Sequence, residues 1–182
     1  DCCSSLVGFL TEIGPVTYNK TTKKFEINKE SWNMNANVLF VESPAGVGFT
    51  KIKDARFFLN DTIQAISLNI ALQNFFALFS QYQKNDFYIT GETYAGTYIP
   101  HLVYQMMKYF EENPDSIKLN MKGFLIGNPY TMEITDFEDS MVEFGFSHAL
   151  IGYTTFINYL YECPHLPQKE IFVYGYEDPA NY

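Results

Sequence analysis

Residues 86–100, with the sequence DFYITGETYAGTYIP, decide the fold that we expect for this chain. Asp86–Thr90 predicts a β-strand, and the glycine-bounded stretch 91–96 predicts a tight turn. Pro100 lies where a proline in the first turn of a helix is tolerated, so a helix is expected to begin directly behind the turn. The stretch is therefore a strand-turn-helix unit.

Regular elements are expected on both sides of this unit. Downstream, the helix carries an apolar face until residues 113–114 (Asn-Pro) end it, and Met121–Gly127 predicts another strand. Upstream, Asn37–Val41 predicts a buried central strand that stops at a Pro- and Gly-rich loop. A helix is predicted over Asn60–Gln83, with its apolar face at Ile63, Ile66, Ile70, Ala71, Phe75, Leu78 and Phe79. Strand, helix, strand, helix, strand predicts an α/β fold with a parallel sheet and crossover helices.

The pattern changes after Asn128 to short, aromatic-rich helical segments at Asp136–Phe146 and Gly152–Tyr161. We interpret residues 1–130 as a partial α/β core and residues 131–182 as the start of a helical cap. The aromatic content of 18% is explained by packing rather than base stacking, because no basic residues are interleaved.

Composition excludes several classes of protein. The 182 residues are 47% hydrophobic and 18% charged, which predicts a folded chain. The net charge of −9 disfavours nucleic acid as a partner, and the cluster Lys20, Lys23 and Lys24 is expected to be a solvated loop. No apolar run is long enough to span a membrane.

Cysteine spacing excludes a simple metal site. The chain has three cysteines, Cys2, Cys3 and Cys163, and neither a Cys-x-x-Cys spacing nor a suitably placed histidine supports metal ligation. We expect no metal and no cofactor. An odd number of cysteines predicts at least one partner elsewhere, and residues 1–5 resemble neither a start nor a signal peptide, so we expect further sequence.

The hexapeptide GETYAG at residues 91–96 has two interpretations: a simple tight turn, or the strained nucleophile turn that lifts a hydroxyl above the sheet of an α/β-hydrolase. The longer motif GETYAGTYIP resembles the G-E-S-Y-A-G-x-Y-[VI]-P signature of the serine carboxypeptidases. Other segments resemble the same family in order: Cys3–Leu6, Glu12–Pro15, residues 32–33, residues 35–49, Asp86–Ile89, residues 122–129 and residues 147–151.

The resemblance implies an α/β-hydrolase fold and a family reaction that releases the C-terminal residue of a peptide through an acyl-enzyme. It places Thr93 at the nucleophile position, where the family has Ser, and the backbone N–H of Tyr94 as an oxyanion donor. A β-branched residue has restricted χ1 and is expected to clash or to turn its hydroxyl away, so we expect little or no activity from this chain.

Other parts of the family's site are expected to lie outside this chain. These are an Asn-Gly-Gly-Pro segment before Asp1 and the catalytic Asp and His after Tyr182. His101, His148 and His165 are interpreted as packing or surface residues rather than substitutes for the base.

Glu12 and Glu92 match the glutamates that bind the substrate's terminal carboxylate, which requires that they hold protons. Each taken alone would be interpreted as a solvated surface residue. Together, inside the two motifs, they predict a carboxylate pocket that takes a peptide C-terminus.

The resemblance also implies that Cys3 and Cys163 form disulfides with distant partners, whereas Cys2 stands where the family has Gly. Such disulfides indicate the secretory pathway, a lysosome, a vacuole or secretion. The sequons at Asn19 and Asn60 are glycosylation candidates. Two alternatives stay open: a non-catalytic structural or peptide-binding subunit associated with further polypeptides, and an acyltransferase that uses the same site.

Overall fold

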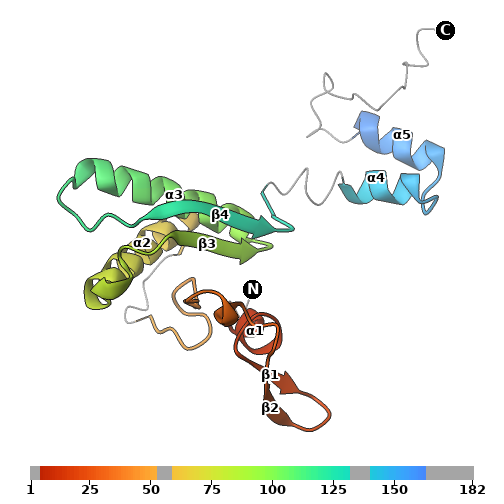
Figure 1. The fold of residues 1–182 in the computed structure, drawn as a ribbon. Coiled ribbons are helices and arrows are strands. Elements are labelled where there is room, and N and C mark those ends of the chain that lie inside the picture. The colour runs from red at the N-terminus through yellow and green to blue at the C-terminus, as the bar shows by residue number, and fades with distance from the viewer. Residues whose placement is uncertain (1–4, 53–58, 132–139, 163–182) are drawn as a thin grey trace. The chain divides into compact units, whose positions relative to one another are not determined.

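The structure is a computed structural model that describes residues 5–52, 59–131 and 140–162 (Figure 1). The chain divides into two compact units, Asp1–Pro129 and Tyr130–Tyr182. The first unit contains helix α1 (Ser5–Thr11), strands β1 (Val16–Asn19) and β2 (Lys24–Ile27), the 3-10 turn η1 (Trp32–Met34), helix α2 (Asp61–Leu78), the 3-10 turn η2 (Ser80–Tyr82), strand β3 (Phe87–Glu92), helix α3 (Ala95–Glu112) and strand β4 (Met121–Gly127). The second contains α4 (Ser140–Ser147) and α5 (Tyr153–Glu162).

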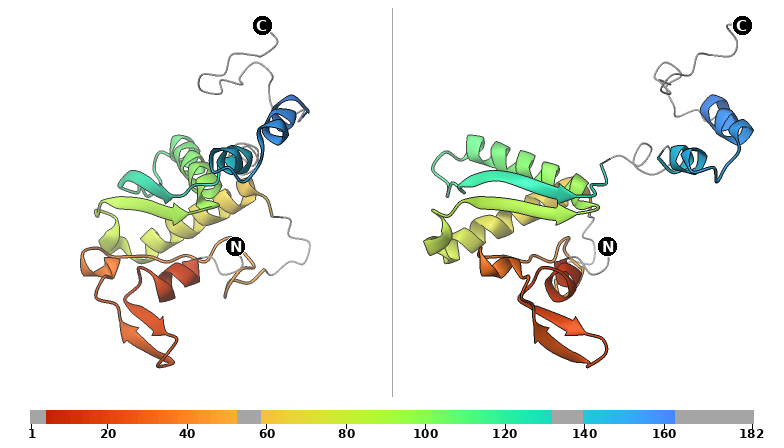
Figure 2. Two further views of the ribbon diagram at one scale, coloured as in Figure 1. Left: turned by 90° about the vertical axis from the view of Figure 1, so that its right-hand side faces the viewer. Right: turned by 45° about the vertical axis from the view of Figure 1, so that its right-hand side comes forward.

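Strands β3 and β4 form a parallel pair connected by α3, which confirms the predicted α/β architecture. Thr90 pairs with Leu125 and Glu92 pairs with Gly127 in the register. Helices α2 and α3 cover the same face of the pair (Figure 2). The strand-helix-strand order predicted from residues 86–127 is therefore the observed one.

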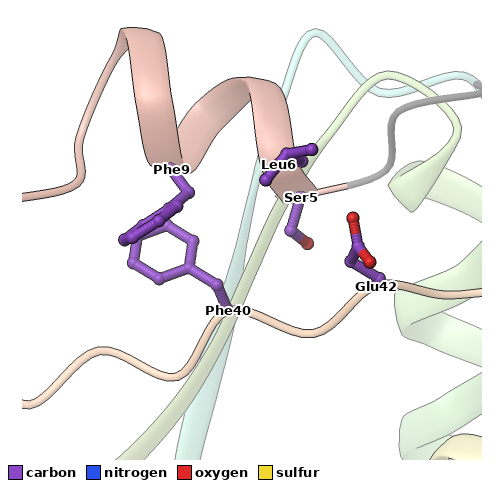
Figure 3. Close-up of a pocket in the computed structure, with 5 residues that line it drawn as sticks. All are labelled: Ser5, Leu6, Phe9, Phe40 and Glu42. Carbon is purple, nitrogen blue, oxygen red and sulfur yellow. The ribbon is translucent and has the colours of Figure 1, made fainter. Parts of the chain in front are cut away.

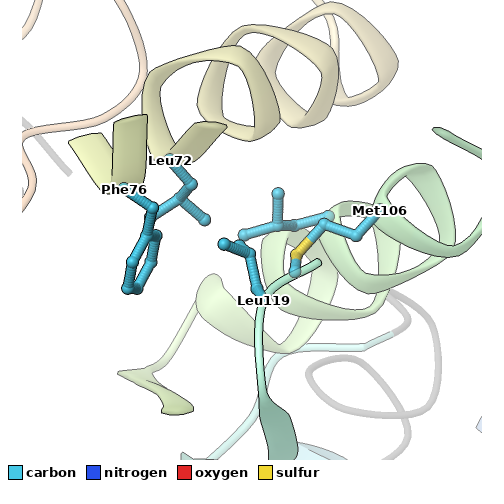
Figure 4. Close-up of a cluster of buried hydrophobic side chains, with 5 residues drawn as sticks. Leu72, Phe76, Met106 and Leu119 are labelled. Atoms are coloured by element: carbon cyan, nitrogen blue, oxygen red, sulfur yellow. The ribbon is translucent and has the colours of Figure 1, made fainter. Parts of the chain in front are cut away.

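The core lies between these two helices and the strands (Figure 4). Leu72 and Phe76 of α2 meet Leu102 and Met106 of α3, each pair spaced by four residues, and Leu119 closes the cluster before β4. Leu102 and Met106 are 2% and 1% exposed, so each side chain contributes about 1.5–3 kcal/mol through burial. These contacts fix α3 against α2, and Phe87 and Ile89 of β3 pack against the same cluster.

The predicted apolar face of α2 is wrong in part, although Phe75 packs against the core as expected. Ile66, Ile70 and Leu78 are exposed, and the helix buries Ala65, Leu72 and Phe76 instead, with Gln64 and Asn69. Apolar residues occur on nearly every side of this helix, so their spacing alone does not identify the side that packs. Its start is as the sequence predicts, because the Asn60 side chain caps it by accepting a hydrogen bond from the Ile63 N–H at 2.8 Å.

The predicted central strand at Asn37–Val41 does not form, because no strand pairs with it in the part of the chain that the structure describes. The segment is extended and lies against α1. The Ser5 hydroxyl donates to the Val41 carbonyl at 2.6 Å, and the Phe9 and Phe40 rings are 4.9 Å apart. Its apolar run fits a buried strand, but a ladder also requires a neighbour.

The hairpin β1–β2 and helix α1 were not expected from the sequence. The strands pair in antiparallel register, with Tyr18 opposite Phe25. Asn19 closes the turn, since its Oδ1 accepts hydrogen bonds from the N–H groups of Thr21 and Thr22. Residues 28–32 follow the hairpin directly and contact the segment that carries Glu12.

The second unit is a pair of helices. Phe146 and Phe156 stack at 4.3 Å with an interplanar angle of 3°, which joins α4 to α5. Both predicted helices are present with shifted bounds, and the part of the first prediction at residues 136–139 lies outside the described residues. Among the described residues, no helix has the length and apolar character needed to cross a bilayer.

Candidate active site

The turn between β3 and α3 consists of Thr93 and Tyr94 alone. Thr93 has a φ of 57°, a left-handed conformation that is uncommon for residues with a Cβ and rarest for β-branched ones. It costs about 1–2 kcal/mol and persists only where the surroundings fix the backbone. The side chain of Thr93 is exposed, as a nucleophile at this position requires.

Hydrogen bonds and small residues hold this turn in place. The Thr93 N–H donates to the Gly127 carbonyl at 3.1 Å, so the chain stays attached to β4 one residue beyond the strand. The Gly96 N–H donates to the Thr93 carbonyl at 3.0 Å. A Cβ on Gly91 would overlap the Cβ of Ala95 and lie 3.0 Å from Ile99 Cδ1, so only glycine lets α3 pass this close to β3.

Tyr94 occupies the N-cap position of α3, with φ −66° and ψ −11°. Its carbonyl accepts hydrogen bonds from the N–H groups of Thr97 and Tyr98. The peptide N–H of Tyr94 thus belongs to the first turn of the helix, where the helix dipole favours negative charge. This is the location that an oxyanion donor needs, and that role for Tyr94 stays a prediction.

The helix differs in one respect from the expectation. Because α3 begins at Ala95, Pro100 is the sixth residue of the helix rather than a residue of its first turn. Proline has no N–H, so the bond that residue 100 would otherwise donate to Gly96 is not made.

Tyr98 packs beside the turn and is affected electrostatically by it. Its ring lies 4.8 Å from that of Tyr94, in an edge-on arrangement. Burial raises the pKa of the Tyr98 phenol above its usual value, and Tyr94 and the nearby carboxylate of Asp61 raise it further. The sequence did not point to Asp61, because only the packing of α2 against α3 brings it near.

The two candidate carboxylates lie on separate elements. Glu92 is the last residue of β3, next to Thr93, and Glu12 follows the end of α1. Both are exposed, and in the described part of the chain no hydrogen bond joins them. The carboxyl group of Glu12 lies over α1, since its Oε2 is 3.6 Å from the position of a Cβ added to Gly8. The shared pocket predicted for the pair therefore stays a prediction.

The described histidines are engaged elsewhere. His101 is exposed on α3, with its Nδ1 2.8 Å from the Thr97 carbonyl. His148 stacks on Phe144 at 3.9 Å in the second unit. His165 lies outside the described residues. No hydrogen bond links Thr93 to a histidine within the ranges that the structure describes.

The other candidate residues have mixed outcomes. Asn60 uses its Oδ1 to cap α2, which leaves the nitrogen that carries a glycan chemically available. Asn19 uses its Nδ2 to donate to Glu26 Oε1 at 2.9 Å, which a glycan on that nitrogen would disturb.

Cys3 and Cys163 lie outside the described residues. Over the described ranges, no group of three or more His, Cys, Asp or Glu residues could hold a metal ion.

A hollow of about 330 Å³ lies beside α1 and is lined by Ser5, Leu6, Phe9, Phe40 and Glu42 (Figure 3). The Glu42 carboxylate accepts a hydrogen bond from the Phe49 N–H at 2.6 Å, and the bare backbone of Gly48 makes room for it. Glu42 therefore supports the loop after residue 43 through Oε2, whereas its Oε1 is buried and has no hydrogen-bond partner in the described part of the chain.

Comparison with known proteins gives a consistent result. A family model described as serine carboxypeptidase matches residues 2–172. The chain is 37% identical over 177 residues to the lysosomal protective protein of Mus musculus, which covers 97% of this chain and 35% of that protein. It is 40% identical over 153 residues to serine carboxypeptidase-like 26 of Oryza sativa subsp. japonica, covering 82% of this chain and 32% of that protein.

Among solved structures, the chain is similar to Kex1(delta)p, a prohormone-processing carboxypeptidase from Saccharomyces cerevisiae. The TM-score is 0.72 at 26% sequence identity, over 84% of this chain and 33% of that one. This likeness confirms the predicted α/β-hydrolase fold. The chain spans about a third of the length of the curated relatives it matches.

Proposed function

The chain belongs to the serine carboxypeptidase family, and from this premise we propose that it carries the nucleophile turn of a carboxypeptidase-like protein that binds a peptide C-terminus but does not cleave it. The observation that carries the proposal is Thr93, a β-branched residue held at φ 57° between β3 and α3. A left-handed residue between a strand and a helix supports the assignment of a nucleophile turn, and a β-branched residue there is unsuited to the chemistry.

Acyl-enzyme formation needs a hydroxyl whose proton is taken by a base while the oxygen attacks a carbonyl. A threonine nucleophile usually relies on its own N-terminal amine, which the internal Thr93 cannot use. His101 bonds locally to its own helix, and His148 stacks on Phe144. A base would have to come from residues outside the described ranges, and the Thr93 methyl would still restrict the direction of attack.

Recognition of a peptide C-terminus requires groups that bind the carboxylate of the peptide. Glu92 is adjacent to Thr93, and Glu12 is held at the end of α1. A carboxyl side chain can donate a hydrogen bond to the substrate carboxylate only while it holds a proton, and acidic conditions favour that form. We propose that Glu12 and Glu92 form this site, with the first-turn amides of α3 beside it.

The test uses the full-length protein that contains this chain. We expect no turnover of blocked dipeptides and no labelling by a serine-directed phosphonate, whereas binding of a dipeptide with a free C-terminus strengthens as the pH falls towards 5. The C-terminal amide of the same dipeptide should show no such dependence. Turnover by the unmodified protein that is lost in Thr93→Ala would overturn the proposal.

Thr93 equally supports a second candidate, a non-catalytic subunit whose role is structural. Stable co-purification with other polypeptides and equal affinity for free and amidated peptides would identify it. In either case we propose passage through the secretory pathway, with a glycan on Asn60 and disulfides at Cys3 and Cys163.

A further inference from the structure

The backbone that carries Glu12 is held at four consecutive carbonyl groups. The carbonyls of Glu12 and Gly14 each accept a hydrogen bond at 2.9 Å from the side-chain amide of Asn28. The Ile13 carbonyl accepts from the Trp32 N–H, and the Pro15 carbonyl accepts from the Asn28 N–H, both at 3.0 Å. All of these donors belong to residues 28–32, which follow the hairpin.

Asn28 is oriented for this task. Its Oδ1 accepts a hydrogen bond from the Glu30 N–H at 3.0 Å, which assigns the oxygen to that side and directs both N–H groups of the amide towards the two carbonyls. One side chain therefore spans the three-residue stretch from Glu12 to Gly14. The buried hydroxyl of Ser31 also lies within reach of the Ile13 carbonyl, at 3.2 Å.

The opposite side of the segment is fixed by α1. The N–H groups of Glu12 and Ile13 both donate to the Gly8 carbonyl, at 3.2 and 2.9 Å. Gly14 is buried, and a Cβ there would overlap the carbonyl of Phe9. The backbone of Glu12 is thus held on both sides, although its own side chain is exposed.

We propose that Asn28 is a positioning residue for Glu12 in the recognition of a peptide C-terminus. This inference rests on the proposed function of Glu12. A side chain that binds a ligand must be held within about 0.5 Å of its binding geometry, and a long exposed side chain meets that requirement only from a fixed backbone. The amide of Asn28 supplies the fixed backbone, because no other side chain donates to both the Glu12 and the Gly14 carbonyl in the described part of the chain.

The experiment measures the affinity of the full-length protein for N-acetyl-Ala-Phe and for its C-terminal amide at pH 5. In Asn28→Ala we expect the preference for the free carboxylate to fall about tenfold, which corresponds to one or two lost hydrogen bonds, while affinity for the amide stays unchanged. Asn28→Asp, which keeps the shape but cannot donate, should behave in the same way. The matched control is Asn35→Ala, since Asn35 is exposed in the same loop and contributes its backbone N–H to the Trp32 carbonyl.

The outcomes separate the two levels of the hypothesis. A wild-type protein that does not prefer the free carboxylate overturns the proposed function, and this inference with it. A wild-type preference that persists in both Asn28 variants overturns the positioning role alone. If both variants are unfolded by circular dichroism while Asn35→Ala is folded, Asn28 holds the fold rather than the glutamate, and the positioning role is also overturned.

Discussion

Replacing Thr93 with Gly should stabilise the protein. The native φ of 57° costs a residue with a Cβ about 1–2 kcal/mol, and glycine adopts it freely. Glycine also adds about 0.5–1 kcal/mol of entropy to the unfolded chain, which offsets part of the gain. Because the Thr93 side chain is exposed, no buried contact is lost. The net expectation is a rise of about 0.5–1 kcal/mol in the free energy of unfolding.

Equilibrium unfolding in urea measures this change, and the midpoint should rise with an unchanged slope. Thr90→Gly is the matched control, because Thr90 is also exposed but lies in extended backbone on β3. That variant should lose about 0.5–1 kcal/mol. If Thr93→Gly lowers the midpoint as Thr90→Gly does, the left-handed turn is not a property of the folded protein and the assignment of a nucleophile turn fails.

Three further predictions concern the surroundings of the turn. Gly91→Ala should lower the free energy of unfolding by about 1–3 kcal/mol or more, because its Cβ would overlap that of Ala95; thermal unfolding measures this. Asn60→Ala should cost about 1 kcal/mol through loss of the α2 cap, and mass spectrometry of the same variant should show one glycan fewer if Asn60 is modified. Burial is the main cause that raises the pKa of Tyr98, so the folded state keeps the phenol proton to a higher pH than the unfolded state does. The contribution of this difference to the free energy of unfolding is complete below about pH 10 and falls as the pH rises further. Urea midpoints between pH 8 and 11 should therefore fall less steeply in Tyr98→Phe than in the wild type.

The sequence was sufficient for elements whose signal is local. Strand β4 has the predicted bounds, α3 follows the predicted turn, and α2 begins next to Asn60, where the pattern begins. The interior face of α2 could not be predicted, because it depends on which side α3 approaches and nearly every side is apolar. The apolar run at Asn37–Val41 could not show that the segment is unpaired either, because pairing also depends on a neighbouring strand.

The same distinction applies to the candidate site. Thr93 and Tyr94 could be located from one decapeptide, because strand, turn and helix are continuous in sequence. The support of Glu12 by Asn28 could not, since it joins residues 16 positions apart through backbone carbonyls, which leave no mark on residue type. The only local signal is polar residues at 28 and 31 directly after a strand, and such residues usually indicate a turn.

The contacts that hold the turn at residue 93 do not depend on which side chain that residue carries. The left-handed conformation at residue 93 is imposed by its neighbours: the bond from its N–H to Gly127, the bond from Gly96 to its carbonyl, and the close approach of Ala95 to Gly91. None of these contacts involves the side chain of residue 93. Substitution there removes chemistry without releasing the backbone, so the first turn of α3 and the adjacent Glu92 stay in place. Under the proposed function, a protein that lost only catalysis would keep this arrangement.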